Sequence, residues 1–435
     1  MKESIWYDGG RHAHPTLTGD IKCDVLIVGG GIAGILTAYM MKESGIDCVL
    51  IEEGRVLCGV TKNTTAKITL QHGYIYHDVI RRYGKERAEM YYRAQLEAIK
   101  SYRALSKAFP CDMETSDAYL YTRSDRAKIE RETDALVSLG CKAEFTDIEL
   151  PFSTNGACRV KNQAQFDPLK LLIPLSCGLR IYEHTRAVEL APRAVRTERG
   201  EIKAESIVIA THFPILNKHG LYPLKMYQSR SYVLALEGAQ RIAGMYIDEK
   251  DGGISLRSHK DLLLLGGGGH RTGKRGGSWQ ELRRHRKEYF PASREVAYWA
   301  TQDCMSLDGI PYIGDYSPRT HGLYVATGFN KWGMTSSMVA ARLLTDRVLG
   351  KENENAEVFS PGRSMLHFQL LANTVSAVAS LLTPTAPRCP HLGCALKYNA
   401  AEHSWDCPCH GSRFDEDGRL LDGPSTADKK SLGGK

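Results

Sequence analysis

A glycine-rich turn between an apolar segment and a helical one constrains the fold of this 435-residue chain more than any other feature. Gly29, Gly31 and Gly34 form the pattern G-x-G-x-x-G after the apolar run 23–28, and residues 32–44 read as a helix. The first glycine permits a tight turn, the second lets the backbone approach a pyrophosphate, and the third lets the helix pack against the strand. The N-terminus of such a helix offers free N–H groups to phosphate.

A second apolar segment completes this unit. Residues 48–51 read as a strand, and Glu52 follows it directly, 18 residues after Gly34. A carboxylate at this position can accept hydrogen bonds from ribose hydroxyls. The glycine pattern alone is weak evidence, but together with both strands, the helix and Glu52 it predicts a dinucleotide-binding β-α-β unit. The spacing does not by itself distinguish FAD from NAD.

The middle of the chain has a different pattern. Residues 84–108 and 126–140 read as helices, whereas 226–236, 254–257 and 261–265 read as strands separated by Asp/Gly turns. An apolar strand followed by a helix returns before residue 350. We therefore predict an α/β fold (α+β overall), in which an antiparallel sheet interrupts the nucleotide-binding domain.

Several segments between residues 20 and 350 resemble the FAD-dependent oxidoreductases of the D-amino-acid oxidase and sarcosine oxidase type. The segments are Val25–Glu53, Arg186–Val188 followed by Glu205–Thr211, Asp308–Gly314, and Thr327–Thr335. The resemblance implies a Rossmann-like FAD-binding domain and an antiparallel-sheet substrate domain. It implies FAD contacts at Gly29, Gly31, Gly34, Glu52, Thr61, Thr65, Val188, Gly328, Phe329, Asn330, Gly333 and Met334.

The same resemblance suggests catalytic and substrate residues. The superfamily often places a basic residue beside the flavin ring, a role that would fall to Lys67, which would assist flavin reduction or reoxidation electrostatically; a surface lysine is the alternative. Tyr232, Arg257 and His270 lie on or after strands that would wall the substrate, and Arg257 could hold a carboxylate with two hydrogen bonds. Each of these three residues could equally be structural. Covalent flavin attachment through Cys304 is not expected, because its spacing from Asp308 differs from the family pattern.

A cysteine/histidine cluster marks the C-terminal part of the chain. Cys389 and His391 form a C-x-H box, and Cys407 and His410 form a C-x-x-H box, with 15 residues between the two boxes. Two thiolates and two imidazoles suit either zinc or a [2Fe–2S] cluster of the Rieske type. The boxes and their flanking residues closely resemble the Rieske pattern, which implies that the cysteines bind one iron and the histidines the other.

Two further cysteines stand inside this pattern. In respiratory and photosynthetic Rieske proteins, cysteines at the positions of Cys394 and Cys409 form a disulfide, and the resemblance implies the same bridge here. A usual Rieske domain has more strands before its first box, so we expect a module reduced to its cluster loops and one hairpin near residues 416–418, supported by the flavin domain.

These patterns together predict the domain boundaries. We expect a discontinuous FAD-binding domain, a substrate domain in two segments, a linker helix and a minimal Rieske module. Their ranges are 20–80, 150–215 and 320–350; 81–149 and 216–319; 351–383; and 384–435.

The whole arrangement resembles bacterial FAD-dependent oxidoreductases with a Rieske tail. It implies a dehydrogenase that oxidises a C–N bond of an amine or amino acid and passes electrons from FAD through the cluster to a one-electron acceptor protein or a quinone-type carrier. One alternative is an oxidase that uses O₂, with a structural or regulatory cluster. Another is a non-catalytic redox sensor or electron-transfer flavoprotein.

Composition argues against other classes of function. The net charge is only +7, and the densest basic run, residues 283–287, is flanked by Glu281 and Glu288, so we expect a solvated helix and no nucleic-acid partner. The uncharged run 364–387 contains polar residues and prolines, which favours a buried or interfacial linker helix over a membrane span. Scattered single cysteines and the lack of a signal-peptide pattern predict a cytoplasmic protein.

Overall fold

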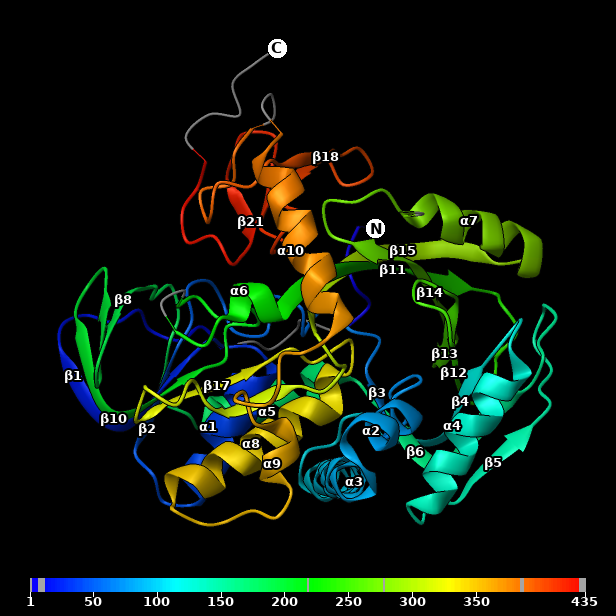
Figure 1. Cartoon of the computed structure of the whole chain (residues 1–435), viewed down its shortest axis with the longest axis horizontal. Coiled ribbons are helices and arrows are strands. Elements are labelled where there is room, and N and C mark those ends of the chain that lie inside the picture. Colours follow the sequence, from blue (N-terminus) through cyan, green and yellow to red (C-terminus); the bar gives the residue numbers. More distant parts are fainter. Residues whose placement is uncertain (1, 7–11, 217–218, 277, 384–386, 430–435) are drawn as a thin grey trace.

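The computed structural model describes residues 2–6, 12–216, 219–276, 278–383 and 387–429, whose strands form sheets of eight, nine and four strands (Figure 1). Residues 384–386 and 430–435 of the predicted Rieske module therefore lie outside the described residues. The sheets confirm the predicted mixture of a nucleotide-binding sheet, an interrupting sheet and a small C-terminal module.

The eight-stranded sheet contains the predicted β-α-β unit. Its order is β16-β17-β10-β1-β2-β7, with β8 and β9 continuing from β10, and β17, β10, β1, β2 and β7 run parallel. The strands are β1 (Ile21–Val28), β2 (Cys48–Ile51), β7 (Ile181–Tyr182), β8 (Ala187–Ala191), β9 (Ala194–Thr197), β10 (Glu201–Ile209), β16 (Tyr312–Asp315) and β17 (Leu323–Thr327). Since residues 25–28 and 48–51 are fully covered, their continuous apolar runs fit a parallel sheet.

Helices cover this sheet and fix its glycine turn. Helix α1 (Ile32–Glu43) packs against α5 (Pro168–Cys177) and α8 (Gly333–Val348). A Cβ atom on Gly34 would lie 1.9 Å from the carbonyl oxygen of Gly29, so only glycine allows this helix to begin so close to the turn.

The nine-stranded sheet has the order β15-β11-β14-β13-β12-β4-β6-β3, with β5 paired to β6. The strands are β3 (Lys67–Ile68), β4 (Glu114–Tyr121), β5 (Ala143–Thr146), β6 (Ala157–Gln165), β11 (Met226–Glu237), β12 (Met245–Asp248), β13 (Ser255–His259), β14 (Leu262–Arg271) and β15 (Arg294–Ser306). Strands β3 and β6 come from ranges that we assigned to the FAD-binding domain, so the chain crosses between the sheets more often than those ranges imply. The domain boundaries themselves remain a prediction.

Most of the remaining helices lie around the two large sheets, whereas α10 (Phe368–Leu381) stands beside the C-terminal module (Figure 1). The others are α2 (Tyr76–Tyr83), α3 (Lys85–Ala108), α4 (Arg126–Ser138), α6 (Tyr222–Lys225), α7 (Ser278–Tyr289) and α9 (Ala356–Phe359). Helices α3, α4 and α7 correspond to the helices expected from the sequence, and α7 carries the basic run. No helix within the described ranges is long and apolar enough to cross a membrane.

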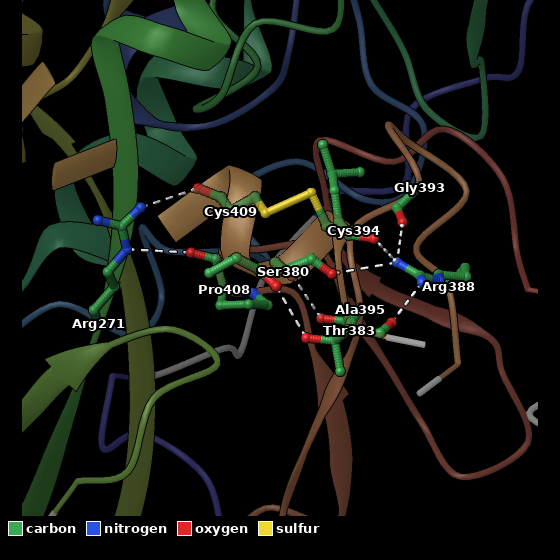
Figure 2. The surroundings of a disulfide bond; sticks show 11 residues. Arg271, Ser380, Thr383, Arg388, Gly393, Cys394, Ala395, Pro408 and Cys409 are labelled. Carbon is green, nitrogen blue, oxygen red and sulfur yellow. Dashed lines mark hydrogen bonds between the residues drawn. A yellow bond between two sulfur atoms is a disulfide. The ribbon is translucent and has the colours of Figure 1, made fainter. Parts of the chain in front are cut away.

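Helix α10 lies in the uncharged run that we predicted to be a buried or interfacial linker helix, and most of its large apolar side chains are exposed. Its polar residues Asn373 and Ser380 are buried, whereas Phe368, Leu371 and Val375 are exposed. Asn373 accepts a hydrogen bond from Arg271. Ser380 donates one to the carbonyl oxygen of Ala395 (Figure 2). Polar contacts therefore attach this helix to the rest of the chain, and most of its apolar side faces outward.

The C-terminal module is larger than the single hairpin that we expected. Strands β18 (Lys397–Asn399), β19 (Ser404–Asp406), β20 (Arg413–Phe414) and β21 (Leu420–Asp422) form a four-stranded antiparallel sheet. Each strand has only two or three residues, too short for a period-two pattern to be recognised in the sequence. Cys394 and Cys409 form the disulfide implied by the Rieske resemblance.

Candidate functional site

One cavity of about 910 Å³ connects all three parts of the chain. It begins at the glycine-rich turn, continues between the eight- and nine-stranded sheets, and ends at residues 421–426 of the C-terminal module. The predicted nucleotide site, substrate wall and cluster module thus share a single space.

The glycine-rich end of the cavity has the features of a dinucleotide cradle. A Cβ on Gly30 would lie 2.7 Å from Cγ1 of Val56, so the turn has no room for a side chain there. The Glu52 carboxylate accepts hydrogen bonds from the backbone N–H groups of Gly30 (2.8 Å) and Gly54 (2.9 Å). The hydroxyl of Thr61 accepts one from the N–H of Ile32 (2.9 Å) and so holds the start of α1.

Most of the residues predicted to contact FAD line this cavity. They are Gly29, Gly31, Glu52, Thr61, Thr65, Gly328, Phe329, Asn330, Gly333 and Met334. Gly34 instead serves the close packing of α1, and Val188 is half exposed outside the lining, which contains its neighbours Arg186 and Ala187. Asn330 fixes its own loop, because its side chain accepts a hydrogen bond from the N–H of Ser306 (2.8 Å).

Lys67 lies in the cavity wall, at the edge of the nine-stranded sheet. Its ammonium group donates a hydrogen bond to the hydroxyl of Ser255 (3.2 Å). Burial, and to a lesser extent the charge of Arg257, lowers the pKa of Lys67 to about 7. This excludes the surface-lysine alternative and leaves a buried amine that changes charge near neutral pH.

The three substrate candidates have different positions. Arg257 is 1% exposed, donates to the carbonyl oxygen of Ala66 (2.8 Å) and lies over the ring of Trp6, so it is not available to hold a substrate carboxylate. The hydroxyl of Tyr232 lies 3.2 Å from Nε2 of His270. Tyr232 lines the cavity, whereas Arg257 and His270 do not.

The four predicted cluster ligands gather in the C-terminal module. Cys389, Cys407 and His410 are at most 5% exposed, and the rings of His391 and His410 are perpendicular with centroids 5.0 Å apart. Nδ1 of His410 is buried and has no hydrogen-bond partner among the described residues, as expected of an atom reserved for a metal.

Backbone contacts attach the cluster loops to the large sheets. The side-chain amide of Gln228 donates to the carbonyl oxygens of His410 (2.7 Å) and Gly423 (3.0 Å), and that of Gln302 donates to Gly411 (2.9 Å). Arg271 donates to the carbonyl oxygens of Pro408 and Cys409, beside the disulfide (Figure 2). The module is therefore supported by side chains on strands β11, β14 and β15 of the nine-stranded sheet, which lie in the range predicted as the substrate domain and not in that of the FAD-binding domain.

A buried ionic cluster reinforces the same interface. Glu402 of the module pairs with Arg230 of β11 and with Arg413, and all three side chains are at most 7% exposed. Arg413 also pairs with Asp406 (3.0 Å) and Asp422 (2.8 Å). Although burial opposes ionisation, the two arginines hold the pKa of Glu402 below its usual value.

Two other groups of cavity residues were not foreseen from the sequence. His212 and Phe213 follow β10 and line the cavity, and the Phe213 ring lies against both histidine ligands. Thr301 and Asp303 line it from β15. No motif marks these positions; only the alternation of residues along a strand could have placed Thr301 and Asp303 on one face.

Comparisons with known proteins agree with this geometry. The family model described as "FAD dependent oxidoreductase" (DAO) matches residues 24–347, and that of the Rieske [2Fe-2S] domain matches residues 377–432. The putative Rieske 2Fe-2S iron-sulfur protein YhfW of Bacillus subtilis (strain 168) is 36% identical, covering 96% of this chain and 95% of the relative.

More distant relatives match the flavoprotein part. The gamma-glutamylputrescine oxidoreductase of Escherichia coli (strain K12) is 23% identical over 81% of this chain and 89% of its own length. The crystal structure of glycine oxidase from Geobacillus kaustophilus aligns with a TM-score of 0.67 at 17% identity, covering 79% of this chain and 99% of that one.

The two family matches assign the cofactors. They confirm FAD and a [2Fe–2S] cluster as the cofactors of this chain, with the cluster in place of zinc in the C-terminal part. The chain therefore belongs to the FAD dependent oxidoreductase family and carries a Rieske [2Fe-2S] domain in its C-terminal part.

Proposed function

We propose that this oxidoreductase is a dehydrogenase that oxidises a C–N bond of an amine or amino acid and passes the electrons through its Rieske cluster to an external acceptor. The supporting observation is that one cavity is walled by the FAD residues at one end and by residues 421–426 of the cluster module at the other. Phe213 lines this cavity and also touches both histidine ligands, which favours direct exchange of electrons between the two sites.

Bound FAD would supply a two-electron acceptor, whereas the cluster takes one electron at a time. Such a pairing suits an acceptor that accepts single electrons, either a protein or a quinone-type carrier. The imine product would leave the cavity and hydrolyse. Lys67 would favour reduction by placing positive charge beside the flavin while it is protonated.

The names of the relatives support a substrate with an oxidisable C–N bond, and they are compatible with both an amine and an amino acid. The relative from Escherichia coli is named for gamma-glutamylputrescine, which carries an amine, and the aligned crystal structure is that of a glycine oxidase. The structure here offers no arginine clamp at Arg257, the only position at which the sequence suggested one.

Anaerobic mixing of the holoprotein with panels of amines and amino acids tests the proposal. We expect a member of one panel to bleach the flavin and then to produce the electron paramagnetic resonance signal of a reduced Rieske cluster. Rapid release of peroxide in air, with the cluster remaining oxidised, would indicate an oxidase instead. Reduction only by NAD(P)H or a protein reductant would indicate an electron-transfer flavoprotein.

A further inference from the structure

The cavity contains a carboxylate that the preceding account does not use. Asp303 lies on β15, lines the cavity and is partly accessible from it. No hydrogen bond or ion pair reaches its side chain from the described residues. Burial raises the pKa of Asp303 to about 6, so the group is mainly ionised at neutral pH.

The neighbours of Asp303 on its face of the sheet are polar apart from Met305. Because side chains alternate along a strand, Thr301, Asp303 and Met305 point to the same side of β15. The paired strand β11 adds Tyr227 and Ser231, which stand opposite Met305 and Thr301, and all five residues line the cavity. The hydroxyl oxygen of Thr301 is buried and has no partner among the described residues.

The charged side chains that act on Asp303 are ion-paired with other residues. Lys331 pairs with Asp251 (2.7 Å), and Arg230 pairs with Glu402. Both cations favour the ionised form of Asp303, while Asp251 opposes it. None of these groups makes a direct contact that would occupy the carboxylate.

The other cations of the cavity wall are poorly placed to receive a substrate carboxylate. Arg55 and Arg186 stand beside Glu183 and Glu53, at the strand end that holds Glu52. Lys250 belongs to an exposed turn, and Lys67 is bound to Ser255 with a pKa lowered to about 7.

We propose that Asp303, with the hydroxyl of Thr301, forms the binding site for the protonated nitrogen of the substrate, which is a cationic amine without a carboxylate next to that nitrogen. An ammonium group donates hydrogen bonds, and the carboxylate and the hydroxyl supply two acceptors that lack donors. A substrate carboxylate in the same place would meet the negative charge of Asp303. This inference rests on the proposed function and narrows its substrate class from amines or amino acids to amines.

A matched pair of compounds separates the two classes. Glycine and isobutylamine differ in that an isopropyl group replaces the carboxylate, and each serves as the parent of a wider panel of amino acids or amines. We expect amines to reduce the flavin of the anaerobic holoprotein. In Asp303→Asn, the amine concentration needed for half-maximal reduction should rise about tenfold or more, because a charge-assisted hydrogen bond is lost.

Two controls keep the result specific. Asp303→Glu should restore most of the amine affinity, and Asp134→Asn, which changes an exposed aspartate on α4, should leave it unchanged. The flavin absorbance spectrum of each variant shows whether FAD is bound as in the parent protein. Reduction by amino acids with an unaltered half-maximal concentration in Asp303→Asn would overturn the inference while leaving the proposed function intact.

A binding measurement separates this inference from the proposed function. Guanidinium stays positively charged over the whole working pH range, donates N–H hydrogen bonds and has no C–H bond to be oxidised. It should perturb the flavin spectrum saturably in the parent protein and about tenfold more weakly in Asp303→Asn. If neither panel reduces the flavin but this difference is found, the proposed reaction fails and the cation site stands; equal binding by both proteins would refute the site.

Discussion

The ring of Phe213 lies edge-on against the ring of His410, with centroids 6.1 Å apart, and its centroid lies 6.5 Å from that of His391. Phe213 is 2% exposed and also lines the FAD cavity. The histidine side of the cluster therefore faces the flavoprotein part of the same chain. If electrons pass from FAD to the cluster as proposed, the module can receive them in the position that it occupies in this structure.

Replacing this ring tests whether it connects the two redox sites. In Phe213→Leu we expect substrate to reduce FAD at the parent rate, while cluster reduction slows by roughly tenfold, equivalent to about 1.4 kcal/mol in the barrier. Stopped-flow absorbance follows both events in one mixing experiment. The control is Phe152→Leu, a buried substitution in the core beside the nine-stranded sheet. If the cluster is reduced at the same rate in both variants, Phe213 does not connect the two redox sites.

Lys67 should make the flavin potential depend on pH near neutrality. Because its pKa in the folded protein is about 7, the ammonium group is present below pH 7 and is lost as the pH rises through that value. We expect the flavin to become harder to reduce over this range, beyond the ordinary pH dependence, by about 30 mV for each 1.4 kcal/mol of lost stabilisation. Spectroelectrochemical titration of Lys67→Met should show only the ordinary pH dependence of the flavin potential. Identical plots of potential against pH for the parent protein and the variant would contradict this role of Lys67.

The same lowered pKa has a consequence for the stability of the apoprotein. Between pH 7 and 10.5 the unfolded chain holds a proton on Lys67 that the folded chain does not. Stability should therefore rise with pH across this window, and Lys67→Met should flatten the slope. Urea unfolding of both apoproteins at several pH values measures the difference, and parallel slopes would exclude a lowered pKa.

Glu402 should be the main electrostatic attachment of the module. Removing one partner of a buried ion pair typically costs about 3–5 kcal/mol, so Glu402→Gln should lower the unfolding midpoint seen by the visible circular dichroism of the cluster. Since the pKa of Glu402 is held below its usual value, this stabilisation is complete at neutral pH and fades only as the pH falls below the usual carboxylate range. The exposed pair Arg196–Glu189 supplies the control, Glu189→Gln, which should change little; equal losses in both variants would contradict the account.

The Cys394–Cys409 disulfide predicts a definite thiol count. With one bridge among twelve cysteines, the denatured apoprotein should show ten free thiols, and twelve would contradict the bridge. The bridge closes a loop of 15 residues, for which chain entropy gives about 3 kcal/mol. The double variant Cys394→Ser/Cys409→Ser should therefore unfold at a lower urea concentration, while its four unchanged cluster ligands still bind iron.

Local spacing made part of this structure predictable. Gly29, Gly31 and Gly34 mark the start of α1, and two of them meet separate steric demands: a Cβ would lie 2.6 Å from the carbonyl oxygen of Ala210 at Gly29 and 1.9 Å from that of Gly29 at Gly34. The ligands of the cluster are likewise confined to two short boxes, and the resemblance to Rieske proteins supplied the disulfide as well. In both places the chemistry depends on residues that are close together in the chain.

The remaining features depend on contacts between distant residues. Glu402 meets Arg230 across 172 positions, and Phe213 meets His410 across almost 200. Arg257 carries the right chemistry for a carboxylate clamp, but tertiary packing directs it to backbone carbonyls, and Asp303 has no local signal at all. The strands of the C-terminal module were missed because two or three residues cannot show alternation.

The most direct test of the account is a single-turnover experiment on the anaerobic holoprotein, with flavin absorbance and the electron paramagnetic resonance signal of the cluster followed on rapidly frozen samples. Cys407→Ser, which lacks a cluster ligand, serves as the control. The account predicts that an amine first bleaches the flavin and that the Rieske signal then appears as part of the flavin absorbance returns, whereas the control stays fully bleached. A flavin that stays bleached beside an oxidised cluster in the parent protein would contradict it.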